Sequence, residues 1–155
     1  MLTKLSFYLA DIFCTVFKLG NIKYMPGTIG SLVGVIAGLY FKYFLSIYVY
    51  IFFFFIIIIF SIIAINVYQS KKGKSDRSEI IIDEFIGQQI PIILFEINLI
   101  NILFGFIFFR FFDILKFYPA NVIDRKFKGS YGIIGDDIIA GAQASLILYL
   151  VNIIL

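Results

Sequence analysis

The longest pattern in the chain is an apolar run from Ile29 to Tyr68, in which Lys42 is the only charged residue. A helix needs about 20 predominantly apolar residues to cross a bilayer. The run therefore predicts two crossings joined by a turn near residues 42–46. Small residues recur every four positions on one face of the first crossing, at Gly30, Gly34 and Gly38. Such a stripe lets a neighbouring helix approach closely.

Three shorter apolar segments follow. They are residues 80–95, 102–116 and 136–155, and the polar segments that precede them are 69–79, 96–101 and 117–132. The first two apolar segments predict a shorter helical hairpin that turns at 96–101, and the third predicts a last crossing. Residues 83–95 also fit a re-entrant segment, and the pattern leaves both interpretations open.

The N-terminal segment, residues 2–18, predicts an amphipathic helix. Its polar stripe consists of Lys4, Asp11, Thr15 and Lys18, and its apolar face of Leu5, Leu9, Ile12 and Val16. A helix with two such faces typically lies in the membrane interface. A cleavable signal peptide is the weaker interpretation, because Asp11 interrupts the apolar core and no A-x-A site follows.

The distribution of basic residues predicts the orientation. Five crossings placed in this way put the N-terminal segment, residues 69–83 and residues 117–135 on one side of the bilayer. Those regions hold almost every Lys and Arg, whereas the opposite side has only Lys42. Basic loops stay in the cytoplasm, so we expect the shared side to be cytoplasmic.

Composition agrees with this topology. The chain has 155 residues, of which 61% are hydrophobic, and its mean hydropathy is +1.00. A soluble domain of this size could not bury so much apolar surface. We therefore expect a single domain, residues 1–155, of the all-α class: a polytopic helical membrane protein with a compact bundle and an N-terminal interfacial helix. Its expected partner at this point is the membrane, and not a nucleic acid.

The residue types that are missing restrict the chemistry. The chain has no histidine, which is the commonest general base and metal ligand. The single cysteine, Cys14, excludes a disulfide framework and a CxxC or zinc motif, and it most simply packs as a small apolar residue. Any catalysis must therefore use carboxylates, Lys or Arg, hydroxyls, backbone amides or a bound metal.

The predicted topology brings four polar clusters to the cytoplasmic face, each at a helix end. They are PGTIGS (26–31), Asp83-Glu84, the set Arg110, Asp113 and Lys116, and Asp136-Asp137.

Each cluster also has a simpler interpretation. Arg110 and Asp113 could be a self-satisfied ion pair, although the planar fork of Arg suits phosphate. Asp83 and Glu84 could match the helix dipole.

A helix start at Asp136-Asp137 would explain one aspartate as an N-cap but the second poorly. Adjacent helical residues point about 100° apart, so we expect Asp137 to face inward beside Gly141 and Ala144. In the segment PGTIGS, a proline at the first helical turn leaves free backbone N–H groups that favour anions, or that only cap the helix.

Taken together, the clusters predict a metal site. At the cytoplasmic face, five acidic residues would lie near only two basic residues on helices, Arg110 and Lys116. The five are Asp83, Glu84, Asp113, Asp136 and Asp137. Clustered carboxylates repel one another or take up protons unless a cation joins them. Oxygen ligands without His or Cys select Mg²⁺, Mn²⁺ or Ca²⁺. With basic groups to hold phosphate, Mg²⁺-assisted phosphoryl chemistry follows as a hypothesis.

Four motifs resemble those of the phosphatidylglycerophosphatase A family. They are PGTIGS, IIDEFIG, FRFFDILKFYP and YGIIGDDIIAGAQA, in this order, and the resemblance spans roughly residues 21–145. It implies a Mg²⁺-dependent lipid phosphatase of the bacterial inner membrane that converts phosphatidylglycerophosphate into phosphatidylglycerol. The matching positions are Thr28, Gly30 and Ser31; Asp83, Glu84 and Gly87; Arg110, Asp113 and Lys116; and Asp136 and Asp137.

These positions lead to an expected division of roles. The expected metal ligands are Asp83, Glu84, Asp136 and Asp137. We expect Arg110 and Lys116 to bind the phosphomonoester and Asp113 to orient Arg110 or complete the metal shell. Thr28, Gly30 and Ser31 are expected to contact phosphate or headgroup. The attacking group is a metal-activated water or, alternatively, a carboxylate that forms an aspartyl-phosphate.

Two departures from the family pattern and two rival functions complete the prediction. Phe117 stands where the family usually has a proline, so we expect the helix before it to run slightly longer. Ser130 replaces a common glycine and changes the expected shape of that loop. The rivals are a small membrane carrier or channel for a divalent cation or proton, and a structural subunit whose charges pair with a neighbour.

Overall fold

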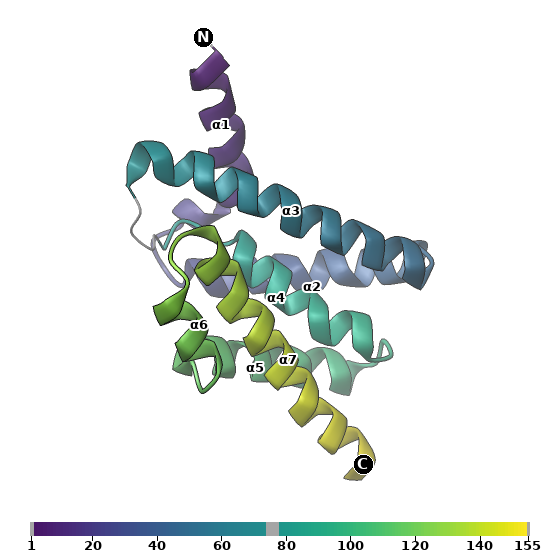
Figure 1. The fold of residues 1–155 in the computed structure, drawn as a ribbon. Coiled ribbons are helices and arrows are strands. Elements are labelled where there is room, and N and C mark those ends of the chain that lie inside the picture. The colour runs from purple at the N-terminus through teal and green to yellow at the C-terminus, as the bar shows by residue number, and fades with distance from the viewer. Residues whose placement is uncertain (1, 74–77, 155) are drawn as a thin grey trace.

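The computed structural model describes residues 2–73 and 78–154. Across these residues it contains seven α-helices, one short 3-10 helix and no strand, which confirms the all-α class. The elements are α1 (Leu2–Cys14), η1 (Leu19–Asn21), α2 (Pro26–Phe44), α3 (Ile47–Lys72), α4 (Ile82–Leu94), α5 (Leu99–Leu115), α6 (Ala120–Lys126) and α7 (Ser130–Ile154). They form a compact bundle (Figure 1).

Within residues 2–73 and 78–154, three helices are long and apolar enough to cross a membrane. They are α2, α3 and α7, with 19, 26 and 25 residues. The predicted turn between the first two crossings is confirmed at residues 45–46. The predicted shorter hairpin is confirmed too: α4 and α5 have 13 and 17 residues and turn at residues 95–98.

Helix α4 lies at the centre of the bundle. It contacts α2, α3, α5 and α7, and nine of its 13 residues are buried. Figure 1 shows α4 running between α3 and α7, and α2 and α5 complete the enclosure. Because neighbouring helices cover it, α4 does not need the length of a lipid-exposed span.

The glycine stripe allows α2 to pack directly on α4. A Cβ added at Gly30 would lie 2.7 Å from the carbonyl oxygen of Ile81, and one at Gly34 would lie 3.0 Å from that of Phe85. The α4–α7 crossing is equally close, since a Cβ at Gly141 would lie 2.4 Å from the carbonyl oxygen of Gly87. The close approach predicted from the stripe is confirmed.

A buried polar contact fixes the register of three helices. The Tyr50 hydroxyl of α3 donates to Oε1 of Gln89 on α4 at 2.6 Å. Gln89 Nε2 donates in turn to the carbonyl oxygens of Gly34 and Phe85 at 2.9 and 3.0 Å. Every polar atom of the Gln89 amide therefore has a partner in a region that excludes water.

The predicted polar stripe of the N-terminal segment is turned toward the protein only in part, because Lys4 and Lys18 are exposed. Helix α1 packs on α3 and ends at Cys14, earlier than predicted. Asp11 and Thr15 are buried, with Asp11 paired to Lys18, whereas Leu5 and Leu9 are 56% and 57% exposed. Leu5 and Leu9 therefore lie on the outward side of α1, where a membrane would place them against lipid.

The polar loops are shorter than predicted. Helix α3 continues to Lys72, so the loop predicted from residue 69 begins at Gly73, and part of it lies outside the described residues. The second predicted loop contains α6. Helix α7 begins at Ser130, so the predicted helix start at Asp136 is wrong. The glycines there serve packing: a Cβ at Gly132 would lie 1.9 Å from the carbonyl oxygen of Phe127.

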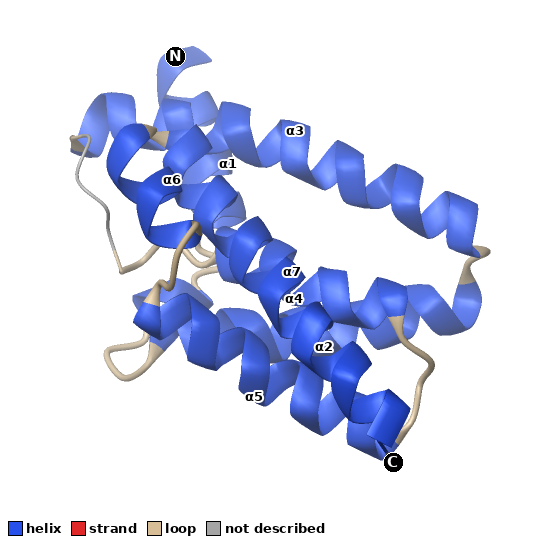
Figure 2. Cartoon of the chain, turned by 60° about the horizontal axis from the view of Figure 1, so that its bottom comes forward, coloured by secondary structure: helices blue, strands red, loops and turns tan. Residues whose placement is uncertain are grey.

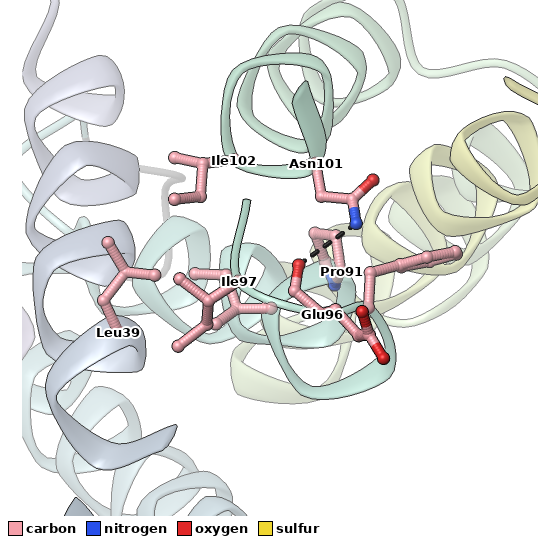
Figure 3. A pocket seen from close by; sticks show the side chains of 8 residues that line it. Leu39, Pro91, Glu96, Ile97, Asn101 and Ile102 are labelled. Carbon is pink, nitrogen blue, oxygen red and sulfur yellow. Dashed lines mark hydrogen bonds between the residues drawn. The ribbon is translucent and has the colours of Figure 1, made fainter. Parts of the chain in front are cut away.

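The bundle has two distinct ends. We call "site end" the one where α2, α4 and α7 begin and α3 and α5 end, and "far end" the one that carries the turns at 45–46 and 95–98. Figure 2 shows the same helices from below. At the far end, a cavity of about 10 Å³ beside Glu96 and Asn101 has room for at most one water (Figure 3). It is too small for a substrate.

Candidate functional site

Three carboxylates from two helices meet at the site end. Asp83 and Glu84 occupy the first turn of α4, as predicted, and Asp137 lies on α7. One oxygen from each of the three lies within 4.8 Å of the other two. The close crossing of α4 and α7 at Gly87 and Gly141 brings them together. We call Asp83, Glu84 and Asp137 the acid group.

The acid group is buried and incompletely satisfied. Asp83 and Asp137 are 9% and 3% exposed. Among the described residues, no hydrogen-bond donor reaches Asp83 Oδ1 or Glu84 Oε2, although both atoms are buried. Leaving buried polar atoms unpaired costs about 1–3 kcal/mol each, and more for charged groups. Three converging carboxylates, two of them with a buried oxygen that lacks a partner, fit a hard divalent cation, which takes oxygen ligands.

Arg110 lies next to this group and connects α5 with the start of α2. Its Nη1 atom pairs with Asp113 Oδ2 and lies 3.3 Å from Ser31 Oγ, to which it donates. The Ser31 hydroxyl donates to the carbonyl oxygen of Gly27 at 2.9 Å. This ion pair is the contact that one of the two roles expected for Asp113, orienting Arg110, requires.

Gly27 makes room for the acid group. A Cβ at this position would lie 2.2 Å from Glu84 Oε1 and 3.2 Å from Arg110 Nη2. The Glu84 carboxylate thus occupies the space that any other side chain at position 27 would fill. Sequence reasoning did not single out this residue, and its only signal was the Pro-Gly pair at the start of the first motif.

Lys116 supplies a positive charge on the other side of the acids. It is the C-cap residue that follows α5, with φ of 45°. Its Nζ lies 2.6 Å from Asp136 Oδ2 and 3.2 Å from Asp124 Oδ2. Burial alone would lower the pKa of Lys116, but hydrogen bonds and charge from Asp136 and Asp124 outweigh it and raise the pKa above its usual value. Lys116 therefore stays protonated. The expectation of a longer helix is wrong, because α5 stops at Leu115.

These side chains surround one cavity of about 360 Å³, a size typical of ligand sites. Its lining consists of Ser78, Ile80, Asp83, Glu84, Asp113, Lys116, Asp124, Ile133, Asp136 and Asp137. Six of the seven predicted catalytic residues are among them, and Arg110 contacts the cavity wall through Asp113. Asp124 was not predicted as a site residue, because it lies in a run of basic residues that is typical of a solvent-exposed loop.

Three of the predicted site residues, Asp136, Gly30 and Thr28, lie outside the acid group. Asp136 is paired with Lys116 and lies outside the acid group, because adjacent residues of a helix point about 100° apart. The structure thus gives it a different neighbour from the other three predicted metal ligands. Gly30 faces the backbone of Ile81, and Thr28 is half-buried in the first turns of α2.

Comparison with known proteins identifies the family. A family model described as phosphatidylglycerophosphatase A matches residues 12–152. The chain is 32% identical over 139 residues to phosphatidylglycerophosphatase A of Haemophilus influenzae, covering 88% of this chain and 84% of that protein. It is 32% identical over 137 residues to the protein of the same name from Escherichia coli, covering 88% and 79%.

A third relative carries a different name. The chain is 29% identical over 149 residues to a Bacteroides thetaiotaomicron protein provisionally named phosphatidylinositol-3-phosphatase, covering 91% of this chain and 92% of that one. No solved structure matches the chain significantly. The family match covers most of the chain and includes all three members of the acid group, so the chain belongs to the phosphatidylglycerophosphatase A family.

Proposed function

We propose that this protein is a Mg²⁺-dependent lipid phosphatase that hydrolyses the terminal phosphomonoester of phosphatidylglycerophosphate to give phosphatidylglycerol. One observation carries the proposal: buried carboxylates with unpartnered oxygens share a cavity with the protonated Lys116. Membership of the family supports this choice of substrate. The proposed location is the bacterial cytoplasmic membrane, with the site end on the cytoplasmic side, as the basic loops predict.

Asp83, Glu84 and Asp137 would hold the ion. Asp136 is a weaker candidate ligand, because Lys116 already takes one of its oxygens. Bound Mg²⁺ would act as a Lewis acid on a phosphoryl oxygen and lower the pKa of a coordinated water.

The basic side chains would bind the phosphomonoester. Lys116 Nζ lies at the cavity wall and can exchange one carboxylate partner for a phosphate oxygen. The Nε donor of Arg110 is buried without an acceptor among the described residues, and Asp113 and Ser31 hold the guanidinium in place. Fixed cations next to the phosphate stabilise charge that develops in the transition state.

Two routes remain for the attacking group, and we propose water. The alternative is attack by a carboxylate of the acid group, which would form an aspartyl-phosphate. Covalent labelling of the protein with radioactive phosphate during turnover would contradict the water route.

The position of the acids also argues against a carrier. A carrier places ionisable groups along the depth of the bilayer, often at broken helices near the midplane. Here Asp83, Glu84, Asp113, Asp136 and Asp137 all line one cavity at one end of the bundle.

The test is phosphate release by the purified protein from phosphatidylglycerophosphate in mixed micelles, with Mg²⁺ or with a chelator. We expect release that requires Mg²⁺, that is lost in Asp83→Asn and that persists in Glu96→Gln, a matched change of an exposed acid at the far end. A parallel reaction with phosphatidylinositol 3-phosphate tests the substrate suggested by the third relative. Unchanged phosphatidylglycerophosphate in the wild-type reaction would overturn the proposal.

A further inference from the structure

A second and larger cavity lies on the other side of α4. Its volume is about 780 Å³, and, of the described residues that line it, all are apolar except Ser6. Helices α1, α2, α3 and α4 contribute its walls, with residues such as Leu9, Phe13, Val33, Ala37, Ala64 and Phe85. We call this cavity the apolar groove.

The groove opens toward the surroundings of α3. Figure 1 shows α2 and α3 running apart from their common turn, with α1 beside the other end of α3. At the rim, Leu9, Phe17, Phe60 and Ile63 are 57%, 82%, 60% and 55% exposed. Phe60 and Ile63 lie on α3, which is long and apolar enough to cross a membrane, so a bilayer would place these two side chains against hydrocarbon.

An apolar space of this size cannot remain empty or hold water in a bilayer. Its walls would lose dispersion contacts if it were void. Water does not enter a cavity that offers it almost no polar partner. The remaining material around these helices is the acyl chain of a lipid, and the volume falls in the range of cavities that enclose a ligand.

One basic side chain, Lys71, lies near one end of the groove. Lys71 follows the lining residue Val67 by one helical turn, so it continues the same face of α3. Its side chain is exposed, and its Nζ lies 5.2 Å from the ring centre of Phe7, the neighbour of the lining residue Ser6. An ammonium group above an apolar groove at the membrane surface suits a lipid phosphate.

Protein separates the apolar groove from the catalytic cavity. The backbone N–H of Ile81 donates to the carbonyl oxygen of Cys14 at 3.0 Å. A Cβ at Gly20 would lie 2.0 Å from the carbonyl oxygen of Glu79, so η1 packs directly on the segment that precedes α4. A lipid in the groove is therefore distinct from the substrate in the catalytic cavity.

We propose that the apolar groove binds an acyl chain of an anionic bilayer phospholipid, with the lipid phosphate beside Lys71. This lipid is a resident component that fills the space between α1, α2 and α3. The inference does not depend on the phosphatase activity, and its test uses no activity measurement.

The first experiment is native mass spectrometry of the full chain purified in mild detergent and supplied with phosphatidylglycerol. We expect one retained lipid on the wild type. Ala37→Phe and Ala64→Phe, which fill the groove from opposite walls, should reduce retention by about tenfold, the order of effect of steric changes in apolar pockets. Ala142→Phe is the matched control, because Ala142 is exposed on α7, and it should retain the lipid. Equal retention in all four proteins would overturn the proposal, and so would a two-chain complex without lipid.

A second experiment locates the chain directly. The protein has no tryptophan, so Ile57→Trp places a single fluorophore in the groove and Ile36→Trp places one on an exposed face of α2. One equivalent of phosphatidylglycerol with brominated acyl chains, in excess detergent, should quench the groove tryptophan and not the exposed one. Lys71→Gln should weaken the preference for phosphatidylglycerol over phosphatidylcholine. Equal quenching at both positions, or none, would contradict a lipid site in the groove.

Discussion

The two ends of the bundle contain similar polar side chains and use them differently. At the far end, Lys42 Nζ donates to the carbonyl oxygens of Ile92 at 2.7 Å, Ile93 at 3.2 Å and Phe95. Ile92 and Ile93 belong to the last turn of α4, whose carbonyls lack intrahelical donors, and Phe95 follows it as the C-cap. Asn101 Nδ2 donates to the carbonyl oxygen of Glu96 at 3.0 Å, as Figure 3 shows.

The site end leaves comparable atoms without partners. Within the part of the chain that the structure describes, the buried atoms lacking hydrogen bonds include oxygens of Asp83, Glu84 and Asp136 and Nε of Arg110, and none belongs to Lys42, Glu96 or Asn101. A satisfied polar network stabilises a fold, whereas a partly satisfied one is costly unless a ligand completes it. The difference between the ends supports the proposal that the far end is structural and that the site end holds a cation and an anion.

Asp137→Asn should produce the largest effect. It removes one charge of the acid group and keeps the shape of the side chain. A metal contributes several kcal/mol to stabilising a phosphoryl transition state, so the rate of phosphate release should fall about a thousandfold. Asp124→Asn changes a residue of the same cavity that lies outside the acid group, and it should lower the rate of phosphate release much less. Equal losses in the two variants would remove the distinction between the acid group and its neighbours.

Lys116→Met should be the next most damaging change. It keeps the apolar stem of the side chain and removes the charge that lies at the cavity wall. By analogy with the removal of one preorganised donor at a reacting oxyanion, kcat should fall about a hundredfold. Steady-state kinetics on phosphatidylglycerophosphate checks this. A wild-type kcat in this variant would show that Lys116 only neutralises Asp136 and Asp124.

Gly27→Ala should have a smaller but specific effect. The new Cβ would collide with Glu84 Oε1 and displace this carboxylate from the acid group. Displacing a metal-site residue costs about tenfold or more in metal affinity or activity. Gly105→Ala on α5 is the matched control, since its Cβ would meet Pro91 Cβ at 3.3 Å. An apparent Mg²⁺ affinity unchanged in Gly27→Ala would argue against Glu84 as a ligand.

Lys42→Met should leave catalysis unaffected. Losing the ammonium group leaves carbonyl oxygens at the end of α4 without a donor, so the free energy of unfolding should fall by about 1–3 kcal/mol. Denaturant titration in detergent measures this loss, and Lys23→Met, an exposed lysine, is the control. A large fall in kcat for folded Lys42→Met would contradict the assignment of the far end to structure alone.

Much of this arrangement could be predicted from the sequence, because charges stand out in an apolar chain. Asp83, Glu84, Arg110 and Asp113 interrupt long hydrophobic runs, and their helical positions were predicted correctly. Topology then required them to meet at one end of the bundle.

What could not be predicted depends on contacts between distant segments. The sequence pattern placed Gly132 in a loop, but this residue lies within α7, where it packs against the backbone of Phe127. The pairing of Lys116 with Asp136 depends on the turn after α5, which no local pattern specifies. The burial of Asp11 and Thr15 depends on how α1 and the turn after it pack on the rest of the bundle, and periodicity alone does not specify that packing.

Direct measurement of metal binding tests the central claim that the acid group holds a divalent cation. Electron paramagnetic resonance can count Mn²⁺ bound to the purified chain, because bound Mn²⁺ loses the signal of the free ion. We expect one Mn²⁺ per wild-type chain, displaced by excess Mg²⁺, and none in Asp137→Asn. A wild-type chain that binds no Mn²⁺, or an Asp137→Asn chain that binds it equally well, would contradict the claim.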